Sequence, residues 1–396
     1  MNHKNANMQI VITGLGMVTS IGLDVKTSCA SARAGLERKS ELELEIVDEQ
    51  ALEMESLTGN KISLITDGFD GVGRLVQLGV VAIEDLLKYS DLEQNELSNT
   101  GMAILLRDNY YQNAYLQRDI VEDIDDDHFR KEIYTDFERE YKEQFRVAER
   151  SLIKNIESYS NIFLKSKLKK CFFGGTADFM SVIDFACTKL RHNEVQRFII
   201  GGIDSLIEGH TLEALNSLGL LHTVENEYGF IPGEAAAFVM LERHDAAVKR
   251  DALIEGVLVA QEKEMELYHR FSRKTVTGEA LSQTIERCLR HSNIGRPASS
   301  VALGIGNING DPFYAKEYGN TLVRMKGVGL PVDFVTWSTA SSFGEIGVAA
   351  GPSAICVGIR AFAGGYARGE NILIWLLSEN ASRGACVISK FKGANG

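Results

Sequence analysis

Residues 172–180 read FFGGTADFM, which is the end of an apolar strand, a glycine pair and the first turn of a helix. The strand extends back over residues 168–173, and residues 180–190 carry apolar side chains at helical spacing. At the start of a helix, free backbone N–H groups and the helix dipole favour negative charge. This junction is therefore predicted to hold a nucleophile or to bind an anion.

Strands and helices alternate on both sides of this junction. Apolar runs predict strands at 9–13, 100–106, 195–200, 235–242, 301–305, 332–337, 372–377 and 384–389. Helical periodicity predicts helices at 25–34, 73–89 and 348–363, with a loop at 338–347. This alternation is typical of the α/β fold class.

The composition limits the classes of partner. With 396 residues, of which 44% are hydrophobic, the chain can build a substantial core. A formal net charge of −12 argues against nucleic acid and against an anionic membrane surface, because both need a basic face. The polar start, Met1 to Met8, lacks the apolar core of a secretory signal, and no run reaches the roughly 18 to 20 apolar residues of a membrane span. We therefore expect a cytoplasmic protein.

Two features that suggest a cofactor or a metal are incomplete. The strand at 9–13 ends in Gly14-Leu15-Gly16, but a dinucleotide-binding turn needs its third glycine where this sequence has Thr19. The cysteines are scattered, without the short paired spacing of a zinc site or a disulfide framework. They are Cys29, Cys171, Cys187, Cys288, Cys356 and Cys386. We expect no cofactor and no metal, and we expect the thiols to be buried or idle.

Residues 108–160 differ in character from the rest of the chain. An acidic run at 122–127 precedes a long charged helix. Its apolar residues recur at steps of four and give it one apolar face: Phe129, Ile133, Phe137, Tyr141 and Phe145. Asp123, Asp125 and Asp127 imitate a calcium loop, but His128 replaces its turn glycine and Tyr134 its last ligand. A helix N-terminus, which favours carboxylates, explains the acidic run better.

Four stretches, in this order, make the chain resemble the β-ketoacyl synthases, the condensing enzymes of fatty-acid and polyketide synthesis. They are residues 10–22, residues 194–205 with the pair Gly201-Gly202, residues 229–242 with Gly233-Glu234, and residues 338–351. The resemblance covers nearly all of the chain except 108–160. It implies an α/β thiolase fold, with two similar halves in a five-layered α-β-α-β-α arrangement. We expect an N-terminal half at 1–250, carrying a helical insertion at about 108–160, and a C-terminal half at 251–396.

The resemblance also implies a cysteine nucleophile at a helix N-terminus, where the dipole favours a thiolate. Counted without gaps from Gly201-Gly202, its position is Thr176. A shift of one or two residues gives Gly175, Ala177 or Asp178, and none of these is a cysteine. Cys171 lies too early, in the strand, and Cys187 too late, inside the helix. The family nucleophile is therefore absent from its expected place.

The rest of the implied catalytic set is also replaced. The first family histidine becomes Asn307 when the loop is anchored on its proline, or Asn309 when it is anchored on its glycine. The second becomes Glu345, and the family lysine becomes Ala340. None of the eight histidines falls in either loop, and the glycine-rich closing loop of the family reads SENASRG at 378–384. The combined loss predicts that condensing activity is gone.

The resemblance then implies a protein that works by binding. Chain-length-factor subunits of this family lack the cysteine and pair with an active synthase, and this sequence looks functionally similar to them. We expect a homodimer, or a heterodimer with a synthase-like subunit, and we also consider an acyl carrier protein as a partner. The family's dimer edge corresponds to the strand at 168–173, with Phe172 and Phe173, although these residues would equally suit a core strand.

Two other functions stay open on the sequence. In the first, Thr176 attacks an acyl thioester with Glu345 as its base, which would make the protein a hydrolase or an acyltransferase. This needs burial to raise the pKa of Glu345, while Asn307 or Asn309 would stabilise the oxyanion. In the second, the chain is a scaffold or adaptor that uses the helix at 129–145 for docking.

Overall fold

The strands of this computed structural model form two sets of five with one common order. The structure describes residues 9–48, 53–92, 94, 96–121, 126–272, 274–292, 300–328, 330–331 and 333–393. The first set is β5-β4-β6-β7-β1 and the second is β10-β9-β11-β12-β8. Numbered along the chain within each set, both read 3-2-4-5-1. The two similar halves expected from the sequence are therefore present.

Nine of these ten strands overlap the apolar runs of the sequence, and β8 was not predicted. In the first set they are β1 (Ile10–Val18), β4 (Thr100–Arg107), β5 (Lys169–Gly174), β6 (Arg197–Ser205) and β7 (Glu234–Arg243). In the second set they are β8 (Gly256–Met265), β9 (Val301–Gly306), β10 (Val335–Ser338), β11 (Asn371–Leu377) and β12 (Ser382–Lys390). The two sets meet edge to edge, where Ile10, Val11 and Ile12 of β1 pair with β8.

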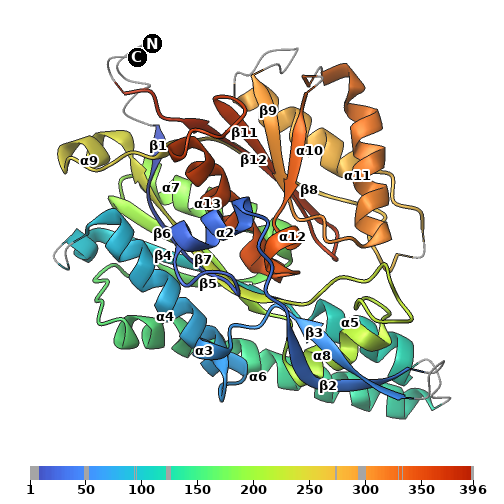
Figure 1. Ribbon diagram of the computed structural model, residues 1–396. Helices are drawn as coiled ribbons and strands as arrows, with labels where there is room; N and C mark the ends of the chain where they lie inside the picture. Colours follow the sequence, from blue (N-terminus) through green and yellow to red (C-terminus); the bar gives the residue numbers. More distant parts are fainter. Residues whose placement is uncertain are drawn as a thin grey trace.

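The helices form three layers around the two sets of strands (Figure 1). Helices α4 (Gly71–Ser90) and α6 (Asp127–Tyr159) cover the outer face of the first set of strands. Helix α10 (Glu279–His291) covers the outer face of the second set, and α11 (Pro312–Arg324) packs beside α10. Helices α7 (Phe179–Arg191) and α13 (Ala350–Ala363) lie between them, and α13 contacts both β7 and β12. This is the five-layered α-β-α-β-α arrangement of the thiolase fold.

The pair Gly201-Gly202 explains how tightly the middle layer packs on β6. A Cβ atom on Gly202 would lie 2.4 Å from the carbonyl oxygen of Val348, and one on Gly201 would lie 2.2 Å from the ring of Phe238. Val348 belongs to the short helix η5 (Gly347–Ala349), which leads into α13. Only glycine allows this close approach, so Gly202 fixes the distance between β6 and the segment that follows Glu345, while Gly201 lets the ring of Phe238 pack against β6 on the other face.

The segment 108–160 is helical, as the sequence predicts. It contains α5 (Tyr110–Tyr115), η2 (Leu116–Val121) and α6. The carboxylate of Asp126 accepts hydrogen bonds from the backbone N–H groups of His128 and Phe129, which caps α6. Asp126, near the end of the acidic run, therefore lies at a helix N-terminus. The calcium-like positions Asp123 and Asp125, and the side chain of Asp127, lie outside the described residues.

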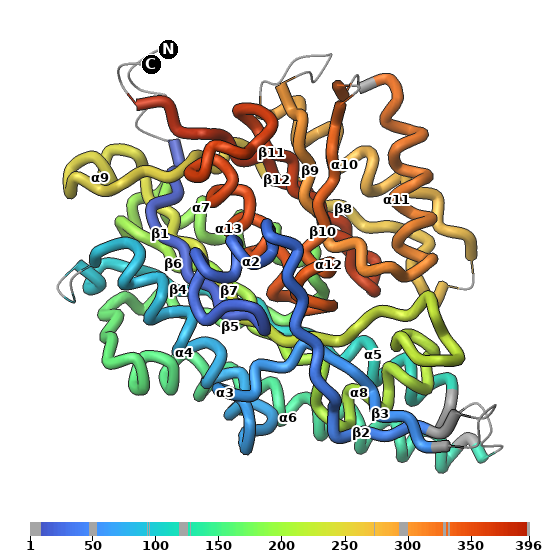
Figure 2. The backbone as a smooth tube through the Cα atoms, in the orientation of Figure 1, coloured from blue at the N-terminus to red at the C-terminus, as the bar shows by residue number. Residues whose placement is uncertain are grey.

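Several elements were not found in the sequence. The hairpin β2 (Ser40–Asp48) and β3 (Glu53–Gly59) extends away from the main strands and packs near α8 (Gly209–Ser217) and α5 (Figure 2). The loop expected at 338–347 contains one turn of helix, α12 (Ala340–Phe343), and just before it the hydroxyl of Ser338 accepts a hydrogen bond from the N–H of Ala340. Helix α2 (Val25–Arg33) corresponds to the helix expected at 25–34. The short elements α3 (Ser63–Thr66), η1 (Glu96–Asn99), η3 (Thr176–Asp178), α9 (His244–Lys249) and η4 (Met325–Val328) complete the fold.

None of the helices in the described ranges is long and apolar enough to cross a bilayer. The boundary between the halves at residue 250 falls just before β8, the first strand of the second set. That boundary stays a prediction.

Candidate functional site

The junction at 172–180 has the architecture that its sequence predicts. Strand β5 ends at Gly174, the turn η3 begins at Thr176, and α7 follows directly. Asp178 accepts a hydrogen bond from the N–H of Gly175 at 2.8 Å, which fixes the turn. Thr176 is only 7% exposed, and its hydroxyl makes no hydrogen bond to any residue that the structure describes. The nucleophile position is therefore occupied by a buried and unassisted hydroxyl.

The loop at 378–383 lies directly against this junction. Ser378 Oγ accepts a hydrogen bond from the N–H of Ala177 at 2.8 Å, and the hydroxyl of Ser382 donates to Asp178 at 2.9 Å. A Cβ atom on Gly175 would lie 2.7 Å from Ser378, so a larger residue does not fit there. The first N–H group after Thr176 is thus bound to a side chain of the loop. This loop stands where the family has its glycine-rich loop.

Arg383 anchors that loop from inside the protein. Its guanidinium is fully buried and donates to both carboxylate oxygens of Glu317 on α11, at 2.5 and 2.9 Å. It also donates to the carbonyl oxygens of Ser378 and Asn380, at 2.8 and 2.7 Å. Such multidentate binding is available to arginine because its donors lie in one rigid plane. The loop therefore has one fixed shape.

A second buried arginine holds Glu379 of the same loop. Arg270 pairs with the carboxylate of Glu379 and with Asp311, the latter at 2.9 Å. The hydroxyl of Tyr111 donates to Glu379 at 3.3 Å. Burial, with the nearby charge of Glu379, raises the pKa of Tyr111 and of Tyr314 well above the usual value. These phenols stay protonated and act here as hydrogen-bond donors.

Asn307, the first candidate for the missing histidine, is engaged in a structural contact. Its side-chain N–H donates to the carbonyl oxygen of Leu377 at 2.8 Å, and its side-chain oxygen accepts from the N–H of Leu377 at 2.9 Å. The residue is 1% exposed. Both polar groups of the amide are thus used to join the end of β9 to the end of β11. This contact uses the amide oxygen and one of its two N–H donors, and it fixes the side chain against β11.

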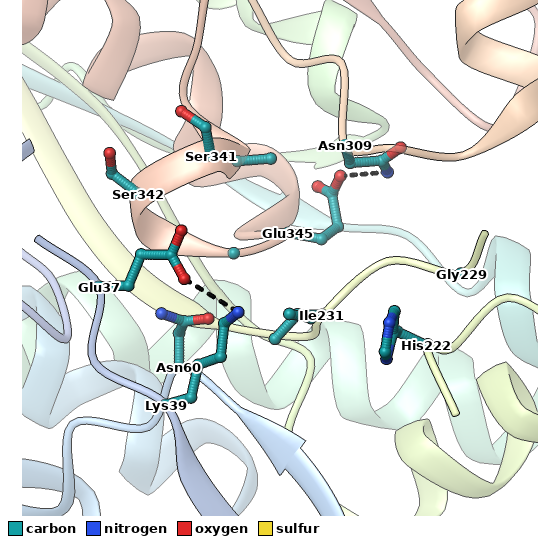
Figure 3. Close-up of a pocket in the computed structure, with 12 residues that line it drawn as sticks. Glu37, Lys39, Asn60, His222, Gly229, Ile231, Asn309, Ser341, Ser342 and Glu345 are labelled. Carbon is teal, nitrogen blue, oxygen red and sulfur yellow. Dashed lines mark hydrogen bonds and ion pairs between the residues drawn. The ribbon is translucent and has the colours of Figure 1, made fainter. Parts of the chain in front are cut away.

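Asn309, the other candidate, contacts Glu345 directly (Figure 3). Its side-chain N–H donates to Glu345 Oε2 at 2.6 Å, while the N–H of Gly347 donates to Oε1 at 2.9 Å. Glu345 is 5% exposed, and burial, with the carboxylates of Glu379 and Asp204 nearby, raises its pKa to about 8. The structure therefore brings Asn309 and Glu345, two of the positions predicted for the missing histidines, together, with the carboxyl largely protonated at neutral pH.

A small pocket of about 180 Å³ opens beside this pair. Asn309, Ala340 and Glu345 line it, together with His222 and Lys39, while Thr176 and Asn307 are not among its lining residues (Figure 3). His222 was not expected at the site, because the synthase resemblance places the family histidines in the two loops that contain Asn309 and Glu345. The pocket offers amide, carboxyl, hydroxyl and imidazole groups, which suit a small polar molecule.

The cysteines near the junction do not replace the nucleophile. Cys171 in β5 and Cys187 in α7 are both buried, and burial raises the pKa of each thiol to about 12. At neutral pH such thiols carry almost no thiolate, which is the reactive form. All six cysteines are free and buried, as the sequence predicts. Within the described residues, Thr176 and Glu345 also make no hydrogen bond to each other.

No protein-family model matches the sequence, and no curated protein matches it. Solved structures are similar over 97% of this chain. An oxazolomycin ketosynthase domain from Streptomyces albus JA3453 has a TM-score of 0.70 at 14% identity, with 74% of that chain covered. A ketosynthase solved with its type II polyketide acyl-carrier protein and bound to the hexaketide has a TM-score of 0.71 at 17% identity, with 99% covered. The ishigamide ketosynthase/chain length factor has a TM-score of 0.65 at 17% identity, with 100% covered.

Proposed function

Since this chain has the thiolase fold of the ketosynthases, we propose that it is a synthase-like binding subunit without condensing activity. It would act beside an active synthase in fatty-acid or polyketide synthesis, in the manner of a chain length factor. One observation carries the proposal. At the positions of the family's cysteine, histidines and lysine the chain has Thr176, Asn307 or Asn309, Glu345 and Ala340, which supply neither a thiol nor an imidazole.

The contacts of these residues support the same conclusion. Asn307 binds the backbone of Leu377, and Ser378 occupies the N–H group of Ala177 beside Thr176. Decarboxylative condensation needs an acylated nucleophile and donors aimed at the thioester oxygen. Among the residues that the structure describes, the junction lacks a thiol and its Ala177 N–H is already bound, while the fold around it is fully built. Binding is the property that such a fold retains.

We propose that β5 provides the surface for the partner. Among the described strands β5 pairs with β4 alone, so its outer edge has free backbone groups. Phe172 and Phe185 pack together beside this edge with ring centroids 5.5 Å apart, and the Lys170 ammonium lies 4.4 Å from the Phe172 centroid. The partner would be a second copy or a synthase-like subunit, with an acyl carrier protein as a further candidate. We place this assembly in the cytoplasm.

The names of two similar structures suit this proposal. One is a ketosynthase/chain length factor, and the other is a ketosynthase in complex with its acyl-carrier protein. Purification of the chain alone and with ketosynthase subunits, followed by light scattering, tests the proposal. We expect a dimer or a mixed complex, which Phe172→Lys dissociates and the control Phe69→Lys leaves intact. A stable monomer that ignores every synthase and carrier protein offered would refute the proposal.

A second candidate function is favoured by the state of Glu345. A general base in an acyl-thioester hydrolase or acyltransferase needs a carboxyl group whose pKa is raised by burial. The pKa of Glu345 is raised to about 8 in this way. Thioester turnover that disappears in both Thr176→Ala and Glu345→Gln would support it. The scaffold alternative depends on α6 instead, and deletion of its N-terminal half without loss of partner binding would exclude that role.

A further inference from the structure

A groove of about 530 Å³ lies between helix α6 and the ends of three strands. Leu106 of β4, Phe173 of β5 and Ile203 of β6 line its floor. These strands are parallel neighbours, and the three residues lie toward their carboxyl ends. In open α/β sheets, ligands bind outside the carboxyl ends of parallel strands. The groove shares no lining residue with the pocket beside Glu345, so it is a separate candidate site.

Aromatic side chains of α6 form one wall of this groove. Tyr141 and Phe145 line it, and their ring centroids are 6.1 Å apart. Phe145 continues the row to Phe173, whose ring centroid is 4.6 Å away. The row therefore joins α6 to the end of β5. Ring faces of this kind pack against apolar bodies and also attract cations.

One buried polar atom in the groove has no partner. Gln112 on α5 is 6% exposed and lines the groove. Its side-chain nitrogen donates to the hydroxyl of Thr211 at 3.4 Å, but Oε1 has no hydrogen-bond partner among the described residues. Buried acceptors are nearly always satisfied, because an unpaired one is costly. A donor from a bound molecule would satisfy Gln112.

The charge of the walls indicates which donor fits. Five carboxylates line the groove against one guanidinium, that of Arg107. They are Asp108, Asp204, Glu140, Glu143 and Glu208. Arg107 pairs with Asp204 at 3.0 Å, so this positive charge is already balanced. Glu143 pairs with Arg146 at 3.4 Å, and burial raises the pKa of Asp108. Glu140 and Glu208 still leave the groove acidic, which disfavours an anion and favours a cation.

We propose that this groove binds a small apolar amine. The ammonium group would donate to Gln112 Oε1 within the acidic walls, and the apolar body would lie between the rings of α6 and the strand ends. An ammonium group supplies N–H donors and positive charge together, and it is attracted by the faces of Tyr141 and Phe145. This inference does not depend on the proposed partner function, because the groove and the β5 edge are tested separately.

Calorimetric titration with three molecules that share one body tests the proposal. They are 2-phenylethylamine, 3-phenylpropanamide and 3-phenylpropanoate. We expect the amine to bind at least about tenfold more tightly than the carboxylate, and more tightly than the amide, because only the amine brings a positive charge to acidic walls. Gln112→Leu should weaken amine binding by about fivefold or more, because it removes the acceptor. Gln112→Glu keeps an acceptor and adds charge, so it should retain or strengthen amine binding.

The control is Gln117→Leu, because Gln117 is exposed and does not line the groove. It should bind the amine as the unaltered protein does. Thermal melts of each variant show whether the fold is kept. Equal or tighter binding of the carboxylate or the amide, no measurable binding of the amine, or an unchanged affinity in a folded Gln112→Leu variant would each overturn the proposal.

Discussion

Glu345 sets the electrostatics of its pocket. Its carboxylate accepts from the N–H groups of Asn309 and Gly347, which favour the charged form, but burial outweighs both and raises the pKa to about 8. A largely neutral carboxyl next to an amide does not repel a polar ligand. At physiological pH the pocket can therefore bind a neutral molecule beside a Glu345 carboxyl group that is itself largely uncharged.

The raised pKa makes Glu345 a source of pH-dependent stability. In the unfolded chain this carboxyl titrates near 4.5, and in the folded protein at about 8, so the folded state holds the proton more tightly. Its contribution to the free energy of unfolding is full below pH 4.5 and is lost as the pH rises through 8. We expect the unaltered protein to lose stability relative to Glu345→Gln between about pH 5 and pH 9.

Urea unfolding of both proteins across this range measures the difference. Glu132→Gln is the control, because Glu132 lies on the exposed side of α6. It shows how the free energy of unfolding changes with pH when a solvent-facing carboxyl is removed. A difference that stays constant with pH, or that moves in favour of the unaltered protein as the pH rises, would show that Glu345 is not held protonated.

Asn307 joins two strand ends through both of its polar groups. Asn307→Ala leaves the N–H and the carbonyl oxygen of Leu377 buried without partners, so we expect the free energy of unfolding to fall by roughly 2 to 4 kcal/mol. Asn216→Ala, at a half-buried position on α8, should change it by about 0.5 kcal/mol or less. Chemical denaturation gives both values. Equal effects of the two substitutions would mean that the contact to Leu377 carries no stability.

Residue types at the site could be predicted from the sequence, but their contacts could not. The sequence located Thr176, Glu345 and Ala340, together with the choice between Asn307 and Asn309. It could not show that Asn307 binds backbone while Asn309 reaches Glu345, because both lie in one irregular loop without periodicity. The raised pKa of Glu345 depends on neighbours that are distant in the chain, such as Asp204.

Among the elements, the loop at 378–383 depends most on a single side chain. Arg383→Met leaves the Glu317 carboxylate and several carbonyl groups buried without a donor. We expect a loss of about 3 to 5 kcal/mol in unfolding free energy, because a buried charge without its partner is strongly destabilising. The double variant Arg383→Met with Glu317→Leu removes both charges and should recover part of that loss.

Denaturant titration of the single and double variants provides the test. If the double variant is less stable than the single variant, Arg383 acts mainly through the loop carbonyl groups. If the single variant is as stable as the unaltered protein, the loop does not depend on this anchor.

Long apolar strands were predictable, and short or amphipathic elements were less so. Strands β4, β6 and β7 are covered on both faces, so their sequences are nearly continuous apolar runs. The hairpin β2–β3 was missed because its residues are mostly polar, with few apolar side chains such as Leu42 and Leu57 buried. Helix α11 was missed because its start, Pro312, reads equally well as part of a loop.

At the scale of the whole molecule, both sets of strands have the order 3-2-4-5-1, although the chain is only 11 to 17% identical to the similar solved structures. The order of four weak stretches along the chain was enough to predict this fold. The same stretches could not reveal the groove under α6, because none of them includes residues of that helix. The fold is therefore kept at this low level of sequence identity.

The central claim is that the fold is retained without condensing activity. Intact-mass analysis of the protein after incubation with malonyl- and acyl-loaded acyl carrier proteins tests it most directly, with an active ketosynthase as the positive control. We expect no acyl adduct on this chain and no condensation product. An adduct that is lost in Thr176→Ala, or a condensation product formed by this chain alone, would contradict the claim.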